Sequence, residues 1–307
     1  IAVLDGGFQD ANLMSCFDSL FLQGRILSTW DFVDHNTNVY DDNWHGTAVL
    51  STMAANIPGD MIGTAPHASY ILLRSEDVNS ENIIEEYNWA SAAEYADSAG
   101  ADVINSSLGY TVFDDQSMNH SYADMDGNTA PGTIAADIAA SKGILVVNSA
   151  GNEGGSSWQY IGCPADGDSV LAIGAVDATE LYAGFSSQGP SFDGRIKPDV
   201  TAQGQGTTVY IPGVTPSTQS SGTSFSGPVI AGSVSCLWQR FPTKKNMEIA
   251  EAVKMSASQF INPDAFLGYG IPDFSVASLV LGGYEPSLFN DGLEVIDFYP
   301  NPLHKGE

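Results

Sequence analysis

A serine set among small residues begins one apolar stretch of the chain, in the segment SGTSFSGPVIAG at residues 221–232. Apolar residues at three- and four-residue spacing follow it, which predicts a helix to about residue 241. Proline has no N–H to donate and is tolerated only near a helix start, so Pro228 places that start close to Ser224. A serine at the positive end of a helix dipole, beside glycines, is either a nucleophile open to substrate or a simple N-cap.

Two residues with acid–base chemistry stand at similar junctions. Asp5 ends the apolar run of residues 1–4, which predicts a buried parallel strand with this side chain at its carboxyl end. His45 opens a predicted helix and is the one histidine of five that stands at such a junction beside glycine and threonine. A helix N-terminus disfavours the imidazolium ion, so we expect a neutral ring. Taken singly, Asp5 as a turn residue and His45 as a helix-start residue are the alternatives.

Together, Asp5, His45 and Ser224 are the residue types that nucleophilic catalysis requires. A serine hydroxyl is a weak nucleophile until a neutral imidazole accepts its proton, and a buried carboxylate orients and stabilises that imidazole. An α/β-hydrolase esterase would need the serine first in the chain and within a Gly-x-Ser-x-Gly turn. Here the serine comes last, which excludes that class.

Three segments resemble the signature segments of the subtilisin-like serine proteases, the subtilases of peptidase family S8. They are IAVLDGGF, WHGTAVLSTMAA and SGTSFSGPVIAG, in that family's order. The resemblance covers residues 1 to about 283 and implies a secreted serine endopeptidase that acts through an Asp5, His45 and Ser224 triad and an acyl-enzyme. A fourth segment, VVNSAGNEG, implies that Asn152 and the Ser224 N–H form the oxyanion hole. A catalytically silent peptide-binding module of subtilase fold is the alternative.

The resemblance also assigns two walls of a substrate pocket, which would pair with an extended peptide. One wall is Ser106, Ser107, Leu108 and Gly109, and the other is Ser149, Ala150 and Gly151. Glu153 would lie at the rim, where we expect it to favour basic residues next to the scissile bond. A solvated Glu153 without effect on specificity is the alternative.

The chain of 307 residues is strongly acidic, with 37 Asp and Glu against 10 Lys and Arg and a net charge of −27. This charge argues against nucleic acids and anionic membrane surfaces as partners and favours cationic peptides. No apolar run approaches the length of a membrane span. The three cysteines, Cys16, Cys163 and Cys236, allow at most one disulfide. Cys236 falls in the apolar helix after Ser224, so we expect it to pack in the core.

Strands and helices alternate along the chain, which predicts an α/β fold with a mostly parallel central sheet flanked by helices. The resemblance implies the three-layer subtilisin-like form of this fold. The predicted strands are residues 1–4, 70–73, 103–104, 143–147, 170–176 and 208–211. The predicted helices begin at residue 45 and span residues 82–99, 134–141, 224–241, 249–255 and 273–281. Residues 110–131 and 185–206 show little periodicity, so we expect long loops there.

Calcium is the structural cofactor that the resemblance suggests, and the chemistry itself requires none. Two acidic loops offer oxygen ligands. One contains Asp31, Asp34, Asp41 and Asp42, and the other contains Asp124, Asp126 and Asn128. The second resembles the first half of a calcium-binding loop, but it lacks the downstream Glu. Solvated acidic loops are the alternative for both.

The end of the chain differs in character from the rest. We assign residues 1–284 to a subtilase catalytic domain and residues 285–307 to a linker and the start of a C-terminal sorting domain. The segment DFYPNP at residues 297–302 resembles the opening of the sorting domain used in type IX secretion. We therefore expect a secreted protein, extracellular or at the cell surface. A Pro-rich linker is the alternative for the tail. We also expect an inhibitory propeptide upstream of residue 1.

Overall fold

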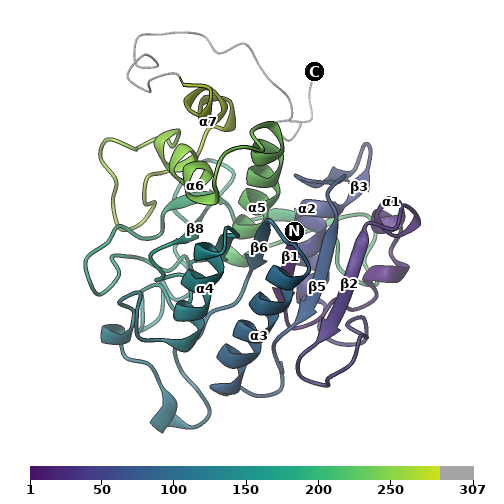
Figure 1. Cartoon of the computed structure of the whole chain (residues 1–307), viewed down its shortest axis with the longest axis horizontal. Helices are drawn as coiled ribbons and strands as arrows, with labels where there is room; N and C mark the ends of the chain where they lie inside the picture. The colour runs from purple at the N-terminus through teal and green to yellow at the C-terminus, as the bar shows by residue number, and fades with distance from the viewer. Residues whose placement is uncertain (284–307) are drawn as a thin grey trace.

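The computed structural model describes residues 1–283 and shows an α/β fold built on one central sheet (Figure 1). Seven strands form this sheet in the order β2-β5-β1-β6-β7-β8-β9, and each neighbouring pair is parallel. Parallel sheets are covered on both faces, which explains why these strands are mostly apolar. The predicted fold class is confirmed. The strands are β1 Ala2–Asp5, β2 Ile26–Asp31, β5 Tyr70–Arg74, β6 Val103–Ser106, β7 Leu145–Ser149, β8 Val170–Val176 and β9 Val200–Gln203.

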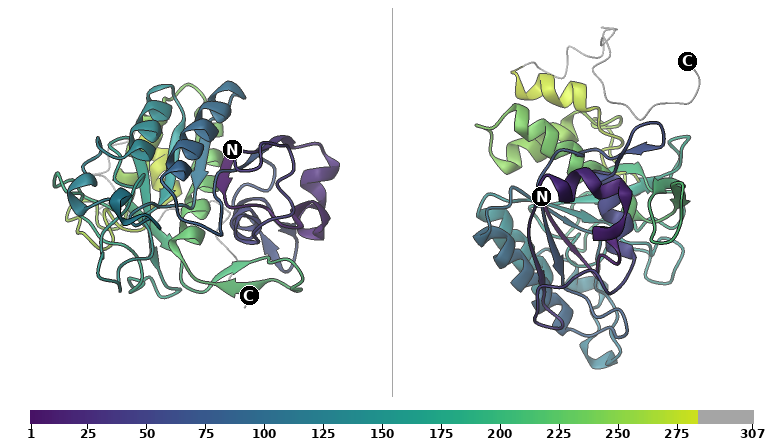
Figure 2. Two further views of the ribbon diagram at one scale, coloured as in Figure 1. Left: turned by 90° about the horizontal axis from the view of Figure 1, so that it is seen from below. Right: turned by 90° about the vertical axis from the view of Figure 1, so that its right-hand side faces the viewer.

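Helices cover both faces of the sheet and so complete three layers (Figures 1 and 2). The helices α3 and α4 lie side by side on one face, α2 and α5 lie on the other, and α6 and α7 pack near α5. Within residues 1–283, no helix is long and apolar enough to cross a membrane. The helices are α1 Asp18–Leu22, α2 His45–Ala54, α3 Ile84–Ser98, α4 Pro131–Ser141, α5 Thr223–Arg240, α6 Asn246–Met255 and α7 Phe274–Leu281.

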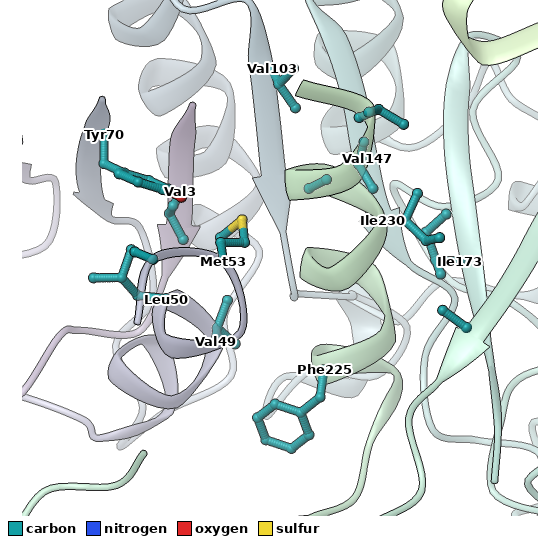
Figure 3. Packing of buried hydrophobic residues seen from close by; sticks show 14 of the residues in the cluster. Val3, Val49, Leu50, Met53, Tyr70, Val103, Val147, Ile173, Phe225 and Ile230 are labelled. Carbon is teal, nitrogen blue, oxygen red and sulfur yellow. The ribbon is translucent and has the colours of Figure 1, made fainter. Parts of the chain in front are cut away.

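The alternation of side chains along the strands divides the apolar residues between two cores. In β1, Val3 joins the core on the α2 and α5 face, whereas Ala2 and Leu4 join the core on the α3 and α4 face. Figure 3 shows the first core, in which side chains of α2 and α5 pack against Val3 and the neighbouring strands. Because strand side chains alternate, Asp5 shares the face of Val3. The register of β1 therefore directs this carboxylate toward the helices that begin with the candidate histidine and serine.

The two edge strands of the sheet were not predicted from the sequence. The strand β2 has the sequence ILSTWD and is only partly buried, so its apolar signal is weak. The strand β9 lies inside residues 185–206, and the prediction that this range contains only loops is wrong. It has only four residues, too few for a visible period, and its pairing with β8 and the hydrogen bond from the Thr201 N–H to Gly270 hold it in place. Two short antiparallel pairs complete the strands: β3 Asn56–Ile57 with β4 Met61–Ile62, and β10 Thr207–Val209 with β11 Thr218–Ser220.

All three cysteines are free, so the one disulfide that the sequence allowed is not formed. Cys16 and Cys163 are buried, whereas Cys236 is exposed, and the prediction that Cys236 packs in the core is wrong. On α5 it faces away from the buried stripe that includes Val234 and Leu237. Its Sγ lies 3.4 Å from the Thr64 carbonyl oxygen.

Candidate active site

Asp5 is the last residue of β1 and is fully buried at the carboxyl end of the sheet. Its Oδ1 accepts hydrogen bonds from the Gly6 N–H at 2.8 Å and from His45 Nδ1 at 2.9 Å, and its Oδ2 lies 3.1 Å from the same nitrogen. These partners compensate for the burial of the carboxylate. We assign the His45 proton to Nδ1 on this geometry, which leaves Nε2 able to accept a proton.

The helix α2 begins at His45 and approaches β1 closely because the next residue is glycine. A Cβ added to Gly46 would lie 2.2 Å from the Gly7 carbonyl oxygen and 2.9 Å from the Asp5 Cβ. Any larger residue would push the helix start away from Asp5. The Asn43 side chain accepts the His45 N–H at 2.8 Å and so satisfies an amide at the helix start. Asn43 was not singled out from the sequence, because its role depends on this contact with the helix start.

The pKa of His45 is raised above its ordinary value. Burial acts to lower it, but the charge of Asp5 and the hydrogen bond to Asp5 raise it by more. This direction is opposite to the one expected from the helix N-terminus alone, because the two contributions of Asp5 to the pKa together exceed that of burial. The side chain is 29% exposed, so the ring still reaches the cleft. A raised pKa strengthens His45 as a proton acceptor.

Ser224 is the second residue of α5 and is 8% exposed. The ring of the next residue, Phe225, lies 6.0 Å from the His45 ring between centroids, so the starts of α2 and α5 meet at the carboxyl end of the sheet. In the described part of the chain, no hydrogen bond joins Ser224 Oγ to His45. Such contacts are often long before substrate binds. The structure thus joins Asp5 to His45 directly and places Ser224 beside them.

The Asn152 side chain is anchored by its carbonyl end. Its Oδ1 accepts hydrogen bonds from the Thr223 N–H at 2.8 Å and from the Thr223 hydroxyl at 3.1 Å. This anchoring leaves the Nδ2 end to donate elsewhere, and Nδ2 lies 3.7 Å from the point that a Cβ on Gly222 would occupy. Among residues 1–283 the Ser224 N–H also has no acceptor. Two donors therefore lie at the N-terminus of α5, where the helix dipole favours negative charge.

A pocket lies beside Ser224, between the ends of β6 and β7. Its volume of about 160 Å³ suits one amino-acid side chain and falls short of the ~300–1,000 Å³ of typical small-molecule sites. It brings together six of the seven predicted wall residues with the predicted rim residue Glu153 and the predicted catalytic residues Asn152 and Ser224. The six wall residues are Ser107, Leu108, Gly109, Ser149, Ala150 and Gly151. Ser106 does not line it. That side chain faces the other core, where its hydroxyl accepts a hydrogen bond from Trp89 Nε1 at 2.9 Å.

Four further residues line the pocket and were not predicted: Thr111, Gly162, Ser187 and Thr223. Ser187 Oγ accepts the Glu153 N–H at 3.0 Å and so fixes the rim. A Cβ added to Gly162 would lie 2.9 Å from Thr111 Cγ2, so the glycine lets these two parts of the lining approach closely. Thr111, Gly162 and Ser187 come from loops without periodicity, whereas Thr223 is the first residue of α5. Only the fold brings them together.

The first acidic loop is already paired with a cation of the protein itself. Arg74, at the end of β5, is 3% exposed, and its Nη1 lies 2.8 Å from carboxylate oxygens of Asp31 and Asp34 and 3.0 Å from Asp42. The three carboxylates lie close enough together to hold a metal ion. However, the guanidinium group occupies the place between them. Calcium does not fit there unless Arg74 moves away. Asp41, the fourth predicted ligand, accepts a hydrogen bond from the Asn38 amide instead.

The carboxylates of the second acidic loop stabilise its own turns. Asp124 Oδ2 accepts hydrogen bonds from the Ser121 N–H at 2.7 Å and the Ser121 hydroxyl at 2.8 Å. Asp126 accepts from the Asn128 N–H at 2.8 Å and from the Thr129 hydroxyl at 3.0 Å. Each carboxylate is thus engaged locally, which is the bonding expected of a solvated loop as well as of a metal site.

A second histidine–carboxylate pair was missed from the sequence, where His120 looked like a loop residue. His120 Nε2 lies 2.6 Å from Oε1 of Glu86, a fully buried residue of α3. The other oxygen, Oε2, accepts the Gly132 N–H at 2.8 Å and lies 3.4 Å from Cys163 Sγ. Burial acts to lower the pKa of His120, but the hydrogen bond to Glu86 and the charges of Glu86, Asp124 and Asp166 together raise it by more, so the pKa is raised.

Comparisons with known proteins agree with this geometry. The Subtilase family matches residues 1–270. Subtilisin E of Bacillus subtilis (strain 168) is 31% identical over 282 residues, which are 91% of this chain and 65% of that protein. Subtilisin of Bacillus pumilus is 30% identical over 282 residues, 91% of this chain and 90% of that protein. The solved structure of the prenylagaramide maturation protease PagA superposes on this chain with a TM-score of 0.72 at 20% identity. The match covers 92% of this chain and 94% of that chain and shows that the two share a fold.

Proposed function

Because the chain belongs to the subtilase family, we propose that it is a secreted serine endopeptidase whose triad is Asp5, His45 and Ser224. The observation that carries the proposal is the hydrogen bond between the buried Asp5 carboxylate and His45, with Ser224 and a pocket for one side chain beside it. His45 Nε2 takes the Ser224 proton as Oγ attacks the scissile carbonyl carbon, and the ring then gives that proton to the leaving amine. Water repeats both steps on the acyl-enzyme and releases the acid and free Ser224.

In this proposal, Asn152 Nδ2 and the Ser224 N–H stabilise the negative oxygen of each tetrahedral intermediate. Donors that are already in place need no reorganisation when the charge develops, which makes them effective in catalysis. The hydrogen bonds from Thr223 to Asn152 Oδ1 support this role, because they fix which end of the amide remains to donate.

The proposed substrate is an extended polypeptide that pairs with the backbone of the two pocket walls and places one side chain in the pocket. Glu153 at the rim and the net charge of −27 both favour a basic residue there. A panel of peptides that differ only in this residue tests the preference. Equal or lower kcat/KM for Lys and Arg than for Leu and Phe would refute it, and Glu153→Gln is the matched control.

The decisive test of the activity is covalent labelling by a fluorophosphonate probe, which reacts with an activated serine. We expect the chain to be labelled, Ser224→Ala to remain unlabelled, and His45→Ala to label very slowly. Folding of each variant is checked by circular dichroism. An intact, folded chain that takes no label would contradict the proposal and leave a peptide-binding module without turnover.

We further propose that residues 1–284 form the catalytic domain and that residues 285–307 are a linker and the start of a sorting domain for type IX secretion. The support is the sequence segment DFYPNP, which lies outside the described residues 1–283. Deletion of residues 285–307 should abolish export if this is correct, and undiminished export would refute it. Our proposal includes an inhibitory propeptide upstream of residue 1. It includes no nucleic-acid partner, because the acidic chain repels phosphates.

For structural calcium, the turn with Asp124, Asp126 and Asn128 is the remaining candidate, and the chemistry needs no metal. A chelator should then lower the melting temperature of the native chain but not that of an Asp124→Asn and Asp126→Asn double variant. An unchanged melting temperature of the native chain would exclude calcium at this turn.

A further inference from the structure

The start of α5 contains a carbonyl group that its own helix cannot satisfy. In an α-helix the Ser224 C=O accepts the N–H of the fourth residue along, but that residue is Pro228, which has none. Ser224 is 8% exposed, so a carbonyl without a donor there would be costly. The donor is Ser107, whose Oγ lies 3.0 Å from the Ser224 carbonyl oxygen. Ser107 belongs to one wall of the pocket.

The other wall reaches the preceding carbonyl in the same way. Ser149 Oγ donates to the Thr223 carbonyl oxygen at 2.8 Å, and the Gly151 N–H donates to the Thr223 hydroxyl at 3.2 Å. The helix lies this close to β7 because residue 227 is glycine, since a Cβ there would be 2.8 Å from Ser149 Oγ. Successive carbonyls on either side of the nucleophile's backbone are therefore held by opposite walls of the pocket.

We propose that the hydroxyl groups of Ser107 and Ser149 are positioning groups that hold Ser224 in register with the substrate pocket. The inference rests on the proposed function, because it concerns the same nucleophile. Fixing the Ser224 carbonyl fixes the peptide plane next to its Cα, and so the direction of Oγ toward the scissile carbon. A small displacement of a reacting group is enough to lower the rate by a large factor.

Ser107 has the larger effect of the two. It is the donor that replaces the missing Pro228 N–H, whereas the Thr223 carbonyl also accepts the Ser226 hydroxyl at 3.1 Å. Removing the Ser107 hydroxyl leaves a buried acceptor unpaired, whereas removing that of Ser149 does not. Both hydroxyl groups donate to backbone carbonyl groups and contact no reacting atom. Ser107 and Ser149 are therefore positioning residues and not catalytic ones.

The test is a set of kinetic measurements with active sites counted by the fluorophosphonate probe, so that misfolded molecules do not contribute. Ser107→Ala should lower kcat about tenfold, which equals about 1.4 kcal/mol, and leave KM within about twofold. Ser149→Ala should lower kcat about threefold or less. Ser107→Thr, which keeps a hydroxyl, should recover most of the loss.

A matched control removes an equally buried hydroxyl elsewhere. Ser256 is 8% exposed, against 7% for Ser107, and its hydroxyl donates to the Val253 carbonyl of α6 at 2.8 Å. Ser256→Ala should leave kcat per active site unchanged. A loss of kcat in Ser256→Ala equal to that in Ser107→Ala would reduce the role of Ser107 to general stability. An unchanged kcat in Ser107→Ala, or a change in KM alone, would also overturn the inference.

A double variant makes the test independent of how well Ser107→Ala folds. Pro228→Ala restores an N–H four residues after Ser224, so the helix can satisfy the carbonyl itself. In that background, the tenfold effect of Ser107→Ala should shrink to about twofold. An undiminished effect would refute the link between Ser107 and the missing N–H. Failure of the proposed function is distinguishable, because the chain with all native residues would then take no probe.

Discussion

Within residues 1–283, two histidines contact a buried carboxylate: His45 contacts Asp5, and His120 contacts Glu86. Burial lowers both histidine pKa values by less than acidic groups raise them, so both are raised. The acidic group is Asp5 for His45, whereas Asp124 and Asp166 add to Glu86 for His120. The pairs differ in what surrounds them. The His45 side chain is 29% exposed beside Ser224 and the pocket, whereas that of His120 is 10% exposed with its ring 5.6 Å from the Phe113 ring.

The two pairs differ in which ring nitrogen of the histidine is bound to the carboxylate. In the first pair, Nδ1 is bound and Nε2 remains able to accept a proton at the cleft. In the second pair, Nε2 is bound, and Glu86 uses its other oxygen to hold the start of α4 through the Gly132 N–H. The second pair therefore joins a loop, α3 and α4. A histidine–carboxylate contact alone does not indicate catalysis, because the position of the unbound nitrogen decides its use.

The largest expected effect separates the two histidines by activity. His45→Ala should lower kcat by about 10⁶-fold, the size known for the histidine of the subtilisin triad and not a value derived from this chain. His120→Ala should lower kcat by less than about threefold, because it touches no reacting group. Both are measured with a peptide substrate at equal concentrations of folded protein. A loss above about 100-fold in folded His120→Ala would break the comparison.

The next effect separates the two carboxylates by stability. Glu86→Ala should lower the free energy of unfolding by about 3–5 kcal/mol, because it leaves His120 and the Gly132 N–H without their buried partner. Asp5→Ala should lower it by about 1–3 kcal/mol, because His45 is partly exposed and water can solvate its ring. Urea denaturation of both variants gives the values. An equal or larger loss in Asp5→Ala would contradict the assignment of Glu86 as the structural carboxylate.

The smallest effect is a difference in pH dependence. Activity should rise with pH through the raised pKa of His45, because the base must be neutral to accept the serine proton. The stability that the charged form of His120 contributes should instead decrease as pH rises. Its folded pKa is raised, so this contribution is fully present below the unfolded value of about 6.5 and is lost as pH rises through the folded pKa.

The second half of that prediction is measured as the difference in unfolding free energy between the native chain and His120→Gln. We expect this difference to be largest at about pH 5–6 and to decrease toward about pH 9. His45 is common to both proteins, so its own contribution cancels. A difference that stays constant or grows with pH would show that the Glu86–His120 pair does not supply this stability.

The parts of the fold that were predictable have a periodic or continuous apolar pattern. The strands β1 and β8 are buried along their length and the helix α5 is buried along one face, and such burial leaves that pattern in the sequence. The edge strands β2 and β9 carry it weakly, because β2 is only partly buried and β9 is short.

The residues of the candidate site that were predictable are likewise those in regular elements. Asp5, His45 and Ser224 stand at the ends of regular elements, so the fold class alone indicates that they gather at one edge of the sheet. Thr111 and Gly162 reach the pocket from irregular loops, and the direction of Ser106 depends on strand register. The raised pKa of His45 was also out of reach, because it depends on the distance to Asp5 and not on residue order.

Arg74, which lies between three carboxylates at the end of β5, affects how the loop from β2 to His45 depends on the surrounding medium. The stabilisation that a bound ion gives a protein depends on the free ion concentration, so it is lost on dilution or when other ligands compete for the ion. Arg74 is covalently part of the chain, so its ion pairs with Asp31, Asp34 and Asp42 do not depend on dilution. The loop that leads from β2 to His45 therefore depends on no ion supply at this cluster, whether the medium is rich in divalent cations or stripped of them.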